Sequence, residues 1–267
     1  MSADIKSLRN RIKSVDSTLH LTKAMGLVAS SKIRRALDAM NKGRQYEEAI
    51  TNLVSLLTEC SECAKSPFMT KREPKRTKII IIAGDRGLAG GYNANIFRLA
   101  KEYEDSEFIP IGKRACDCFS GEKYFAESFS LDDATKLSKK LCEEFAKSEY
   151  DRLGIISTKY ISMMSQDARI DWVLPLTKNE ESQNKSVVFE PDELTILNTA
   201  VCEYVSGILV SKVRESFASE VAARRCAMDS AGKNAQEMID DLKLQYNRAR
   251  QGAITQELTE IVAGSDI

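Results

Sequence analysis

Apolar residues alternate at spacings of three and four along the N-terminal part of the chain. The pattern runs from Ile5 to Leu57 without a proline. A 3.5-residue repeat of this length is typical of a left-handed coiled coil, whose apolar stripe is the seam between two helices. At ~1.5 Å per residue this helix is roughly 80 Å long. Its seam consists of Ile5, Leu8, Ile12, Val15, Leu19, Thr22, Gly26, Ala29, Ile33, Ala36 and Met40, then Ile50, Val54 and Leu57 after a weak patch at Gly43 and Glu47.

The C-terminal part repeats this pattern from about Asp192 to Val262, again without a proline. The start Pro191-Asp192-Glu193 suits a helix entry, where acidic side chains are favoured by the helix dipole. The predicted helix is roughly 100 Å long at the same rise. Its seam is Ala218, Val221, Met228, Gly232, Ala235, Ile239, Leu242, Tyr246, Ala249 and Ala253, with Arg225 as a polar interruption.

Each of these helices has an apolar stripe without a partner in its own segment. We therefore predict that the first and last helices pair antiparallel, because the middle of the chain must close the connection near one end. Small seam residues such as Gly26 and Gly232 let the two backbones approach closely. A globular core is the alternative use of the same stripes, but single helices much longer than ~25 residues are unusual in a compact domain.

The middle of the chain, about Thr77 to Thr177, alternates strand and helix patterns. Lys78–Ala83 is a continuous apolar run, which is typical of a strand buried on both faces. The order predicts a central Rossmann-like α/β domain with a mainly parallel sheet, beside the paired terminal helices. The other predicted strands are Phe108–Ile111, Arg152–Tyr160 and Ile170–Leu176, and the helices are Asn95–Glu104 and Asp132–Ser148. We expect three parts: a helix over 1–66, the α/β domain over 75–178 and a helix over 190–267, with a polar exit at Asn179–Lys185.

Composition limits the classes of function. The chain is 43% hydrophobic and 29% charged, as expected of a folded protein. Its 39 basic and 39 acidic residues balance, which argues against a dedicated nucleic-acid binder. No apolar run approaches the roughly 20 residues that span a bilayer, and Met1–Asp4 has no apolar signal core. We expect a chain kept in a cytosol-like compartment that reaches a membrane only through partners.

The sequence offers little material for catalysis or metal binding. Seven scattered cysteines indicate free thiols in a reducing compartment. The C-x-x-C of Cys60 and Cys63 lacks a second ligand pair for zinc, and the single histidine, His20, is distant in sequence. No Ser-His-Asp or Cys-His arrangement is indicated. We expect no catalytic residues, no cofactor and no metal site.

A glycine-rich loop follows the first predicted strand, where phosphates are cradled in many α/β proteins. The lysine and hydroxyl of G-x-x-x-x-G-K-[ST] are absent, and G-x-G-x-x-G is absent too. We interpret the loop as a structural turn in which glycines supply positive φ and Asn93 caps the next helix. Its residues are Gly84, Asp85, Arg86, Gly87, Gly90, Gly91 and Asn93.

The first helix is basic. Up to Arg44 it carries ten basic residues against three acidic ones. A basic helix suits nucleic acid, an anionic membrane or an acidic protein surface. Neither intercalating aromatics nor a wide apolar face accompanies the charge, so we favour an acidic protein partner.

Several blocks in order along the chain resemble the γ subunits of F-type ATP synthases. They are Ile5–Val15, Leu21–Lys32, Gly84–Asn93 (with Ala89 where cysteine is common), Glu220–Met228, Asn234–Ala235 and Tyr246–Leu258. The resemblance implies a coiled-coil rotor shaft inside a hexamer of α and β subunits, turned by proton flow through the membrane c-ring. The α/β domain would be a foot near the c-ring and the ε subunit. The chain would have no catalytic site, would occur once per complex, and would lie at the cytoplasmic face of a bacterial plasma membrane.

The same resemblance implies partner contacts by matching position. Lys23 and Met25 would lie near the β subunit, as would the polar cluster Arg250, Gln251 and Thr255. Phe189 and Glu190 match the segment that touches the c-ring and ε. The departure is Gly26, where the family often has a long polar side chain, and glycine weakens a helix by about 1 kcal/mol relative to alanine.

Two other classes of function stay open from the residues. One is an enzyme with a degenerate nucleotide-binding loop at Gly84–Asn93, which binding of ATP to the isolated chain would support. The other is a coiled-coil scaffold, which predicts a stable homodimer instead of one copy per multi-subunit assembly.

Overall fold

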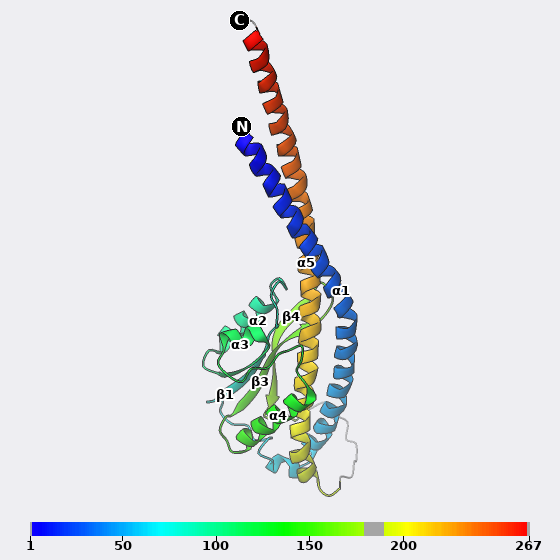
Figure 1. The fold of residues 1–267 in the computed structure, drawn as a ribbon. Coiled ribbons are helices and arrows are strands. Elements are labelled where there is room, and N and C mark those ends of the chain that lie inside the picture. The colour runs from blue at the N-terminus through cyan, green and yellow to red at the C-terminus, as the bar shows by residue number, and fades with distance from the viewer. Residues whose placement is uncertain (1, 179–189, 266–267) are drawn as a thin grey trace. The chain divides into compact units, whose positions relative to one another are not determined.

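The computed structural model describes residues 2–178 and 190–265 (Figure 1). Helix α1 spans Ser2–Glu59 and helix α5 spans Glu193–Ser265, which confirms the two predicted long helices. The chain divides into two compact units. Met1–Ser30 and Arg224–Ile267 form the first, here called the helical unit, and Ser31–Ala223 form the second, the α/β unit. Each long helix contributes to both.

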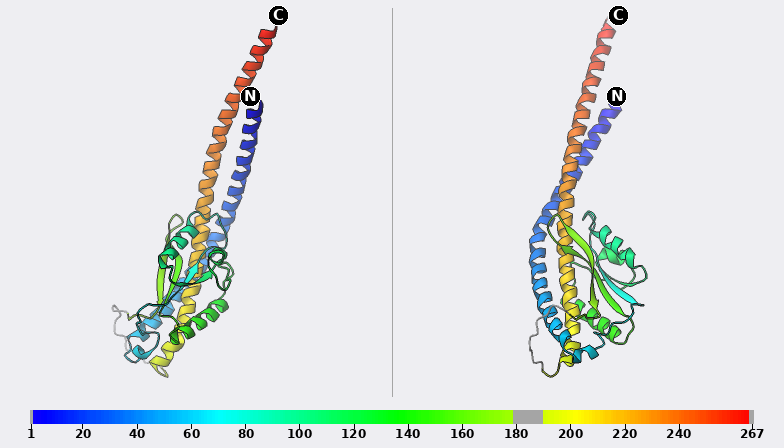
Figure 2. Two further views of the ribbon diagram at one scale, coloured as in Figure 1. Left: turned by 90° about the vertical axis from the view of Figure 1, so that its left-hand side faces the viewer. Right: turned by 180° about the vertical axis from the view of Figure 1, so that it is seen from behind.

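In the helical unit, α1 and α5 pair antiparallel through the predicted seam (Figure 2). A Cβ added to Gly26 would lie 3.7 Å from the Cβ of Met228, and one added to Gly232 would lie 3.7 Å from Thr22 Oγ1. Moving four residues toward the N-terminus of α1 therefore moves the contact four residues toward the C-terminus of α5, as expected of an antiparallel pair. Small residues face a neighbour at both places, so the backbones approach closely, as predicted. Leu19, Ala235 and Ile239 form the buried cluster of this seam, with Val15 packed against it.

The C-terminal end of α5 extends past α1 in this unit (Figure 1). The register of Gly26 with Met228 places the start of α1 opposite Gly252. Among the described residues, no part of α1 faces α5 beyond Gly252. Four large apolar side chains are exposed there, namely Ile254, Leu258, Ile261 and Val262.

The α/β unit contains a four-stranded sheet with strand order β2-β1-β3-β4. β1 is parallel to both β2 and β3, and β4 runs antiparallel to β3, so the prediction of a mainly parallel sheet is confirmed. β4 begins earlier than predicted because it forms a hairpin with β3. The strands are β1 (Thr77–Ile82), β2 (Glu107–Ile111), β3 (Arg152–Tyr160) and β4 (Gln166–Leu174).

Helices cover both faces of this sheet. Ile79 and Ile81 of β1 pack in one buried cluster with α2, while Ile80 and Ile82 pack in the other with α4 and α5. This alternation explains the uninterrupted apolar run of β1. α2 (Tyr92–Ala100, continued by η2, Lys101–Tyr103) and α4 (Leu131–Ala146) confirm the predicted helices, whereas the short α3 (Lys113–Cys118) and η1 (Glu62–Lys65) were not predicted.

The part of α5 within the α/β unit is buried on most of its circumference. An 18-residue stretch of α5 has a mean hydropathy of 1.4, so α5 is long and apolar enough by composition to cross a membrane. Half of this stretch is buried inside the protein. The expectation that no segment approaches this length is therefore wrong. Polar residues such as Ser206 interrupt this stretch, so it is not recognised as a continuous apolar run in the sequence. Burial of Val201, Val205 and Leu209 in the core accounts for the apolar composition.

Candidate functional site

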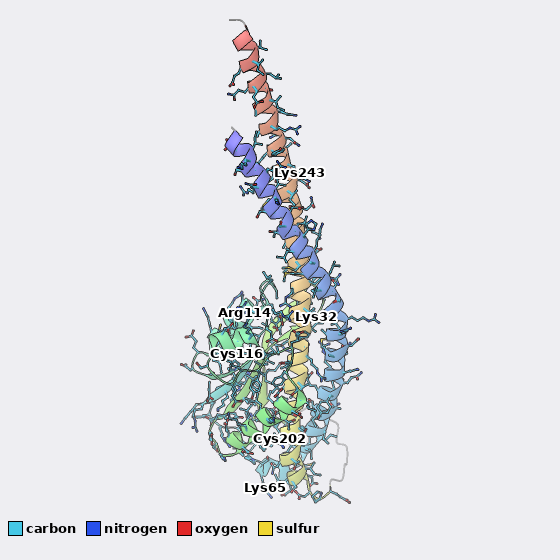
Figure 3. The ribbon with its side chains drawn as sticks, in the orientation of Figure 1. Lys32, Lys65, Arg114, Cys116, Cys202 and Lys243 are labelled. Atoms are coloured by element: carbon cyan, nitrogen blue, oxygen red, sulfur yellow. The ribbon has the colours of Figure 1, made fainter. Side chains whose placement is uncertain are left out.

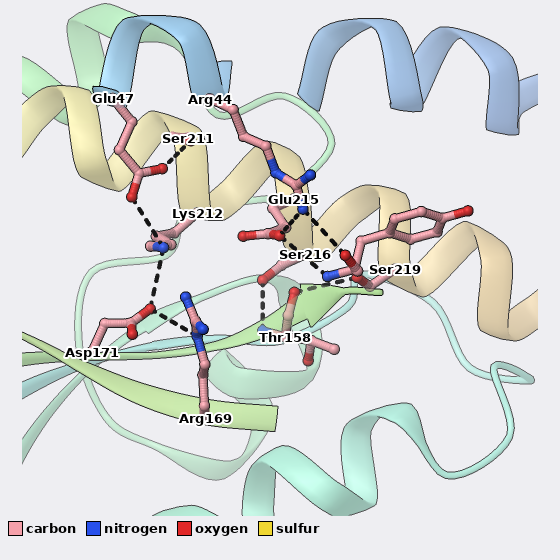
Figure 4. Close-up of polar contacts among 11 residues, drawn as sticks. Arg44, Glu47, Thr158, Arg169, Asp171, Ser211, Lys212, Glu215, Ser216 and Ser219 are labelled. Atoms are coloured by element: carbon pink, nitrogen blue, oxygen red, sulfur yellow. Dashed lines mark hydrogen bonds and ion pairs between the residues drawn. The ribbon is translucent and has the colours of Figure 1, made fainter. Parts of the chain in front are cut away.

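Polar contacts replace apolar ones where the predicted seam of α1 is weakest. Glu47 accepts a hydrogen bond from Ser211 Oγ at 2.6 Å and forms an ion pair with Lys212 Nζ at 3.1 Å (Figure 4). The same Nζ lies 3.2 Å from the carboxylate of Asp171 on β4. The Lys212 side chain is only 7% exposed. A single ammonium group therefore joins α1, α5 and the sheet.

A second ion pair lies one helical turn further along α5. The Glu215 carboxylate accepts hydrogen bonds from the guanidinium of Arg44 at 2.5 Å and from the backbone N–H of Tyr160 at 3.2 Å. Arg44 also donates to the carbonyl of Tyr160 at 3.1 Å. We call Arg44, Glu47, Lys212 and Glu215 the polar clamp. Because hydrogen bonds are directional and apolar contacts are not, the clamp fixes the rotation of α5 against α1 and the sheet.

An open cleft of about 760 Å³ lies beside the clamp. Its charged groups are of both signs, and four of the seven pair with one another, Arg44 with Glu215 and Lys212 with Glu47. The four basic and three acidic groups leave a net charge of only +1, so the cleft has no strong preference for an anion or a cation. The charged lining is Arg44, Lys159, Arg169 and Lys212 against Glu47, Glu48 and Glu215.

Asp85 organises the glycine-rich turn after β1. Its carboxylate accepts hydrogen bonds from the backbone N–H groups of Lys113 at 2.9 Å, Ala126 at 3.0 Å and Glu127 at 2.8 Å. Arg86 adds an ion pair to Glu127 at 3.3 Å. The turn therefore holds the loop before α4 and the start of α3 in place.

Asn93 does not cap α2, so that prediction is wrong. The helix begins after Gly91, and no side chain caps it. The Oδ1 atom of Asn93 instead accepts a hydrogen bond from Gly84 N–H at 2.9 Å, which closes the turn across nine residues. Of Gly84, Gly87, Gly90 and Gly91, only Gly90 has the predicted positive φ, at 58°, while the non-glycine Leu88 has φ of 61°.

The predicted partner residues of the helical unit lie on its surface but not together. Lys23 is exposed and Met25 half-buried on α1, while Arg250, Gln251 and Thr255 are exposed on α5. Thr255 Oγ1 donates to the carbonyl of Gln251 at 2.9 Å, so these two share a helix face. The register pairs Lys23 with a part of α5 about 19 residues before Arg250, or ~28 Å along the helix. Glu190 is exposed, and Phe189 lies outside the described residues.

All seven cysteines are free thiols. Burial raises the pKa of Cys63 to about 11, with smaller contributions from Cys60 and Glu193, so this thiol stays protonated near neutral pH. Within residues 2–178 and 190–265 no group of three or more His, Cys, Asp or Glu side chains is placed to hold a metal ion.

The fold and the clamp define a class of protein: long helices from the two ends of one chain pair antiparallel, and an α/β domain lies between them in sequence. The sequence matches the family described as ATP synthase over residues 4–266. The chain is 37% identical to the sodium ion specific ATP synthase gamma chain of Acetobacterium woodii, covering 100% of this chain and 99% of that one. It is 38% identical to the ATP synthase gamma chain of Ruminococcus albus, covering 98% of each.

Solved structures share the fold. A chain of the Euglena gracilis mitochondrial ATP synthase (OSCP/F1/c-ring) matches with a TM-score of 0.71 at 17% identity, covering 98% of this chain and 94% of that one. A chain of the Tetrahymena thermophila mitochondrial central stalk and c-ring matches with a TM-score of 0.64 at 21% identity, covering 79% and 99%. On the full-length similarity to the two bacterial proteins, this chain belongs to the family of ATP synthase gamma chains.

Proposed function

We propose that this chain is the central rotor shaft of an F-type ATP synthase and couples proton flow through a membrane ring to ATP synthesis or hydrolysis by rotation. Membership of the gamma chain family supports the proposal. The observation that carries it is the end of α5 beyond Gly252, which no described part of α1 faces. A helix end with exposed Ile254 and Leu258 suits insertion into a surrounding protein.

The proposed partners are the α and β subunits, the ε subunit and the c-ring, with one copy of this chain per complex. Relatives of the same fold come from assemblies described as F1/c-ring and as central stalk and c-ring. Catalysis belongs to the β subunits in this proposal, and this chain has no catalytic residues of its own. The complex lies at the cytoplasmic face of a bacterial plasma membrane, which the chain reaches only through its partners.

The proposed contacts follow the matching positions. Lys23 and Met25 meet the β subunit along α1, where the basic surface of the helix suits an acidic partner. Arg250, Gln251 and Thr255 meet it near the end of α5. Phe189 and Glu190, at the other end of α5, contact the c-ring and ε. The turn Gly84–Asn93 remains structural in this proposal.

Torque passes from the α/β domain to α5 through the polar clamp. A rotor biases each catalytic subunit by making different contacts with its alternative conformations. That requires the helix to turn with the domain that is driven. Lys212 and Glu215 hold α5 by directional ion pairs to α1 and the sheet, which supports this role.

Charge reversal at Arg250 tests the contact assignment. We expect Arg250→Glu to lower ATP turnover by the assembled complex at least several-fold, because the new carboxylate disrupts the polar contact with β. Lys243→Glu is the matched control, since Lys243 is also exposed on α5 and lies one heptad, or about two helical turns, earlier (Figure 3). Subunit stoichiometry and ATP hydrolysis are measured on the same purified complexes.

Unchanged turnover in a fully assembled Arg250→Glu complex would contradict the assignment. Equal losses in the Arg250→Glu and Lys243→Glu complexes would show a general charge effect along the helix, not a specific contact at Arg250.

A further inference from the structure

Two cysteines from different helices meet where α4 packs against α5 within the α/β unit. Cys142 of α4 is only 2% exposed and belongs to the core of the unit. Cys202 of α5 is half-buried and packs against the same core (Figure 3). The Cys142 thiol donates a hydrogen bond to the sulfur of Cys202. The fold therefore places two free thiols in contact across a helix–helix interface.

Charged groups of α4 show which face of that helix Cys202 meets. Besides the hydrogen bond from Cys142, the charges of Lys139 and Glu143 act on the Cys202 thiol. Lys139 lies one helical turn before Cys142, and Glu143 is the residue after it. Cys202 therefore faces the turn of α4 that carries Cys142. This contact lies in a packed core, whose side chains have little freedom to move apart.

The two thiols are not equivalent. The hydrogen bond from Cys142 lowers the pKa of the Cys202 thiol, against the opposing effect of partial burial. The same hydrogen bond, together with burial, raises the pKa of the Cys142 thiol. Thiol–disulfide exchange requires a thiolate that the oxidant can reach. Cys202 is therefore the more reactive thiol, and Cys142 is a shielded thiol beside it.

We propose that Cys142 and Cys202 are a redox-sensitive pair, and that a low-molecular-weight disulfide such as oxidised glutathione converts them into a disulfide between α4 and α5. The Cys202 thiolate attacks one sulfur of the oxidant, which forms a mixed disulfide on Cys202 and releases one thiolate. Cys142 gives its proton to that thiolate and attacks the Cys202 sulfur. The mixed disulfide breaks, and the second thiolate leaves and takes a proton from water. The two cysteines lose two electrons, and one molecule of oxidant is reduced to two thiols.

The cross-link ties a helix of the α/β domain to the buried part of α5. The chain between the two cysteines contains β3 and β4, so the disulfide closes a long loop. A closed loop restricts the unfolded chain and stabilises the folded one. In a reducing compartment the pair stays as two thiols, so the cross-link forms only under oxidising conditions.

The test uses the full-length chain and oxidised glutathione as the probe. The folded chain is incubated with an excess of the oxidant, quenched with acid, denatured, alkylated and digested for mass spectrometry. We expect a linked peptide pair that contains Cys142 and Cys202 as the main intramolecular cross-link. We also expect the oxidised chain to unfold at a temperature roughly 5 °C or more above that of the chain reduced with dithiothreitol.

Three serine variants separate the roles of the thiols. Cys142→Ser keeps the reactive thiol without its partner, and we expect the reaction to stop with one glutathione on Cys202. Cys202→Ser leaves only the shielded thiol, and we expect neither a cross-link nor glutathione on Cys142 in the folded chain. Cys226→Ser removes another half-buried thiol of α5 and is the matched control. We expect it to keep both the cross-link and the rise in unfolding temperature.

A wild-type chain that keeps both thiols in excess oxidant, or that carries glutathione on Cys202 without a link to Cys142, would overturn the proposal. Oxidation of the chain in urea is the remaining control. An equal share of the Cys142–Cys202 link in the unfolded chain would show that the fold does not direct the pairing, and would overturn it as well. The wild-type peptide map decides the outcome even if a serine variant fails to fold.

Discussion

The two parts of α5 are one continuous helix with opposite surroundings. From Glu193 to Ala223 the helix lies within the α/β unit, and nearly every side chain between Val205 and Ala222 is buried. From Arg224 to Val262 only Met228, Ala235, Ile239 and Leu242 are buried, and the other side chains are half-buried or exposed. The same secondary structure is therefore a core element in one unit and half of a two-helix pair in the other.

This difference follows from how many faces of the helix are apolar in each part. A helix that is apolar all round needs neighbours on all sides, and the sheet, α4 and α1 supply them. A helix with a single stripe needs one partner and leaves its other faces available. The buried part holds ion pairs as well, through Lys212 and Glu215, whereas the ion pair of Lys233 with Asp229 in the helical unit is fully on the surface.

The largest expected effect comes from opening a cavity in the buried part. Leu209 is fully buried in the core of the α/β unit. We expect Leu209→Ala to lower the free energy of unfolding by about 3 kcal/mol, within the ~2–5 kcal/mol range for such truncations. Ile239→Ala is the counterpart in the helical unit, and we expect a smaller loss because a two-helix seam collapses more easily around the gap. Chemical denaturation measures both, with exposed Leu244→Ala as the control.

Equal losses for Leu209→Ala and Ile239→Ala would break the comparison. That result would mean that the two-helix seam is packed as rigidly as the domain core.

An intermediate effect is expected at the polar clamp. Glu215→Ala removes the carboxylate partner of Arg44 and leaves the N–H of Tyr160 without its acceptor. We expect a loss of about 2 kcal/mol in the free energy of unfolding, reduced from the value of a fully buried pair because Arg44 is 36% exposed. The matched change in the helical unit is Asp229→Ala, whose surface ion pair with Lys233 contributes ~0.5 kcal/mol or less. Denaturation at low and high salt separates the two, since only the surface pair is strongly screened.

If Glu215→Ala lowered the free energy of unfolding as little as Asp229→Ala does, the result would show that apolar contacts alone hold α5. The proposed transmission of torque through Lys212 and Glu215 would then lose its support.

A smaller effect than at the clamp is expected at the cap of α4, on the surface of the α/β unit. Ser130 and Asp133 form a capping box, and these hydrogen bonds lower the pKa of the Asp133 carboxyl. We expect Ser130→Ala to cost about 1 kcal/mol near neutral pH. A lowered folded-state pKa stabilises above the unfolded-state pKa of about 4, and this contribution is lost as pH falls through the folded-state value.

The difference in unfolding free energy between wild type and Ser130→Ala is therefore expected to shrink on acidification below about pH 4. Urea denaturation across pH 3–7 measures it. A difference that grows toward low pH would contradict the assigned sign.

Much of the fold could be read from local patterns. The seam from Ile5 to Met40 and the seam from Met228 to Ala253 are half-buried or buried where predicted, because helix periodicity alone decides which residues share a face. The apolar run of β1 likewise identified a strand covered on both sides. The absence of a phosphate-binding lysine in the turn after β1 was visible in the sequence too.

The tertiary structure alone decided which distant residues meet. The apolar periodicity showed that Glu47 is a weak position of the seam. It did not show that the Glu47 carboxylate accepts a hydrogen bond from Ser211 and forms an ion pair with Lys212. Asn93 was given the wrong partner, because a side-chain amide at a helix start serves a cap or a loop closure equally well. Nothing near Gly84 in sequence indicated that Glu220, on a helix more than a hundred residues later, needs the space of its missing side chain. Local sequence determines which face of an element is apolar, whereas long-range packing determines which polar group finds its partner on another element.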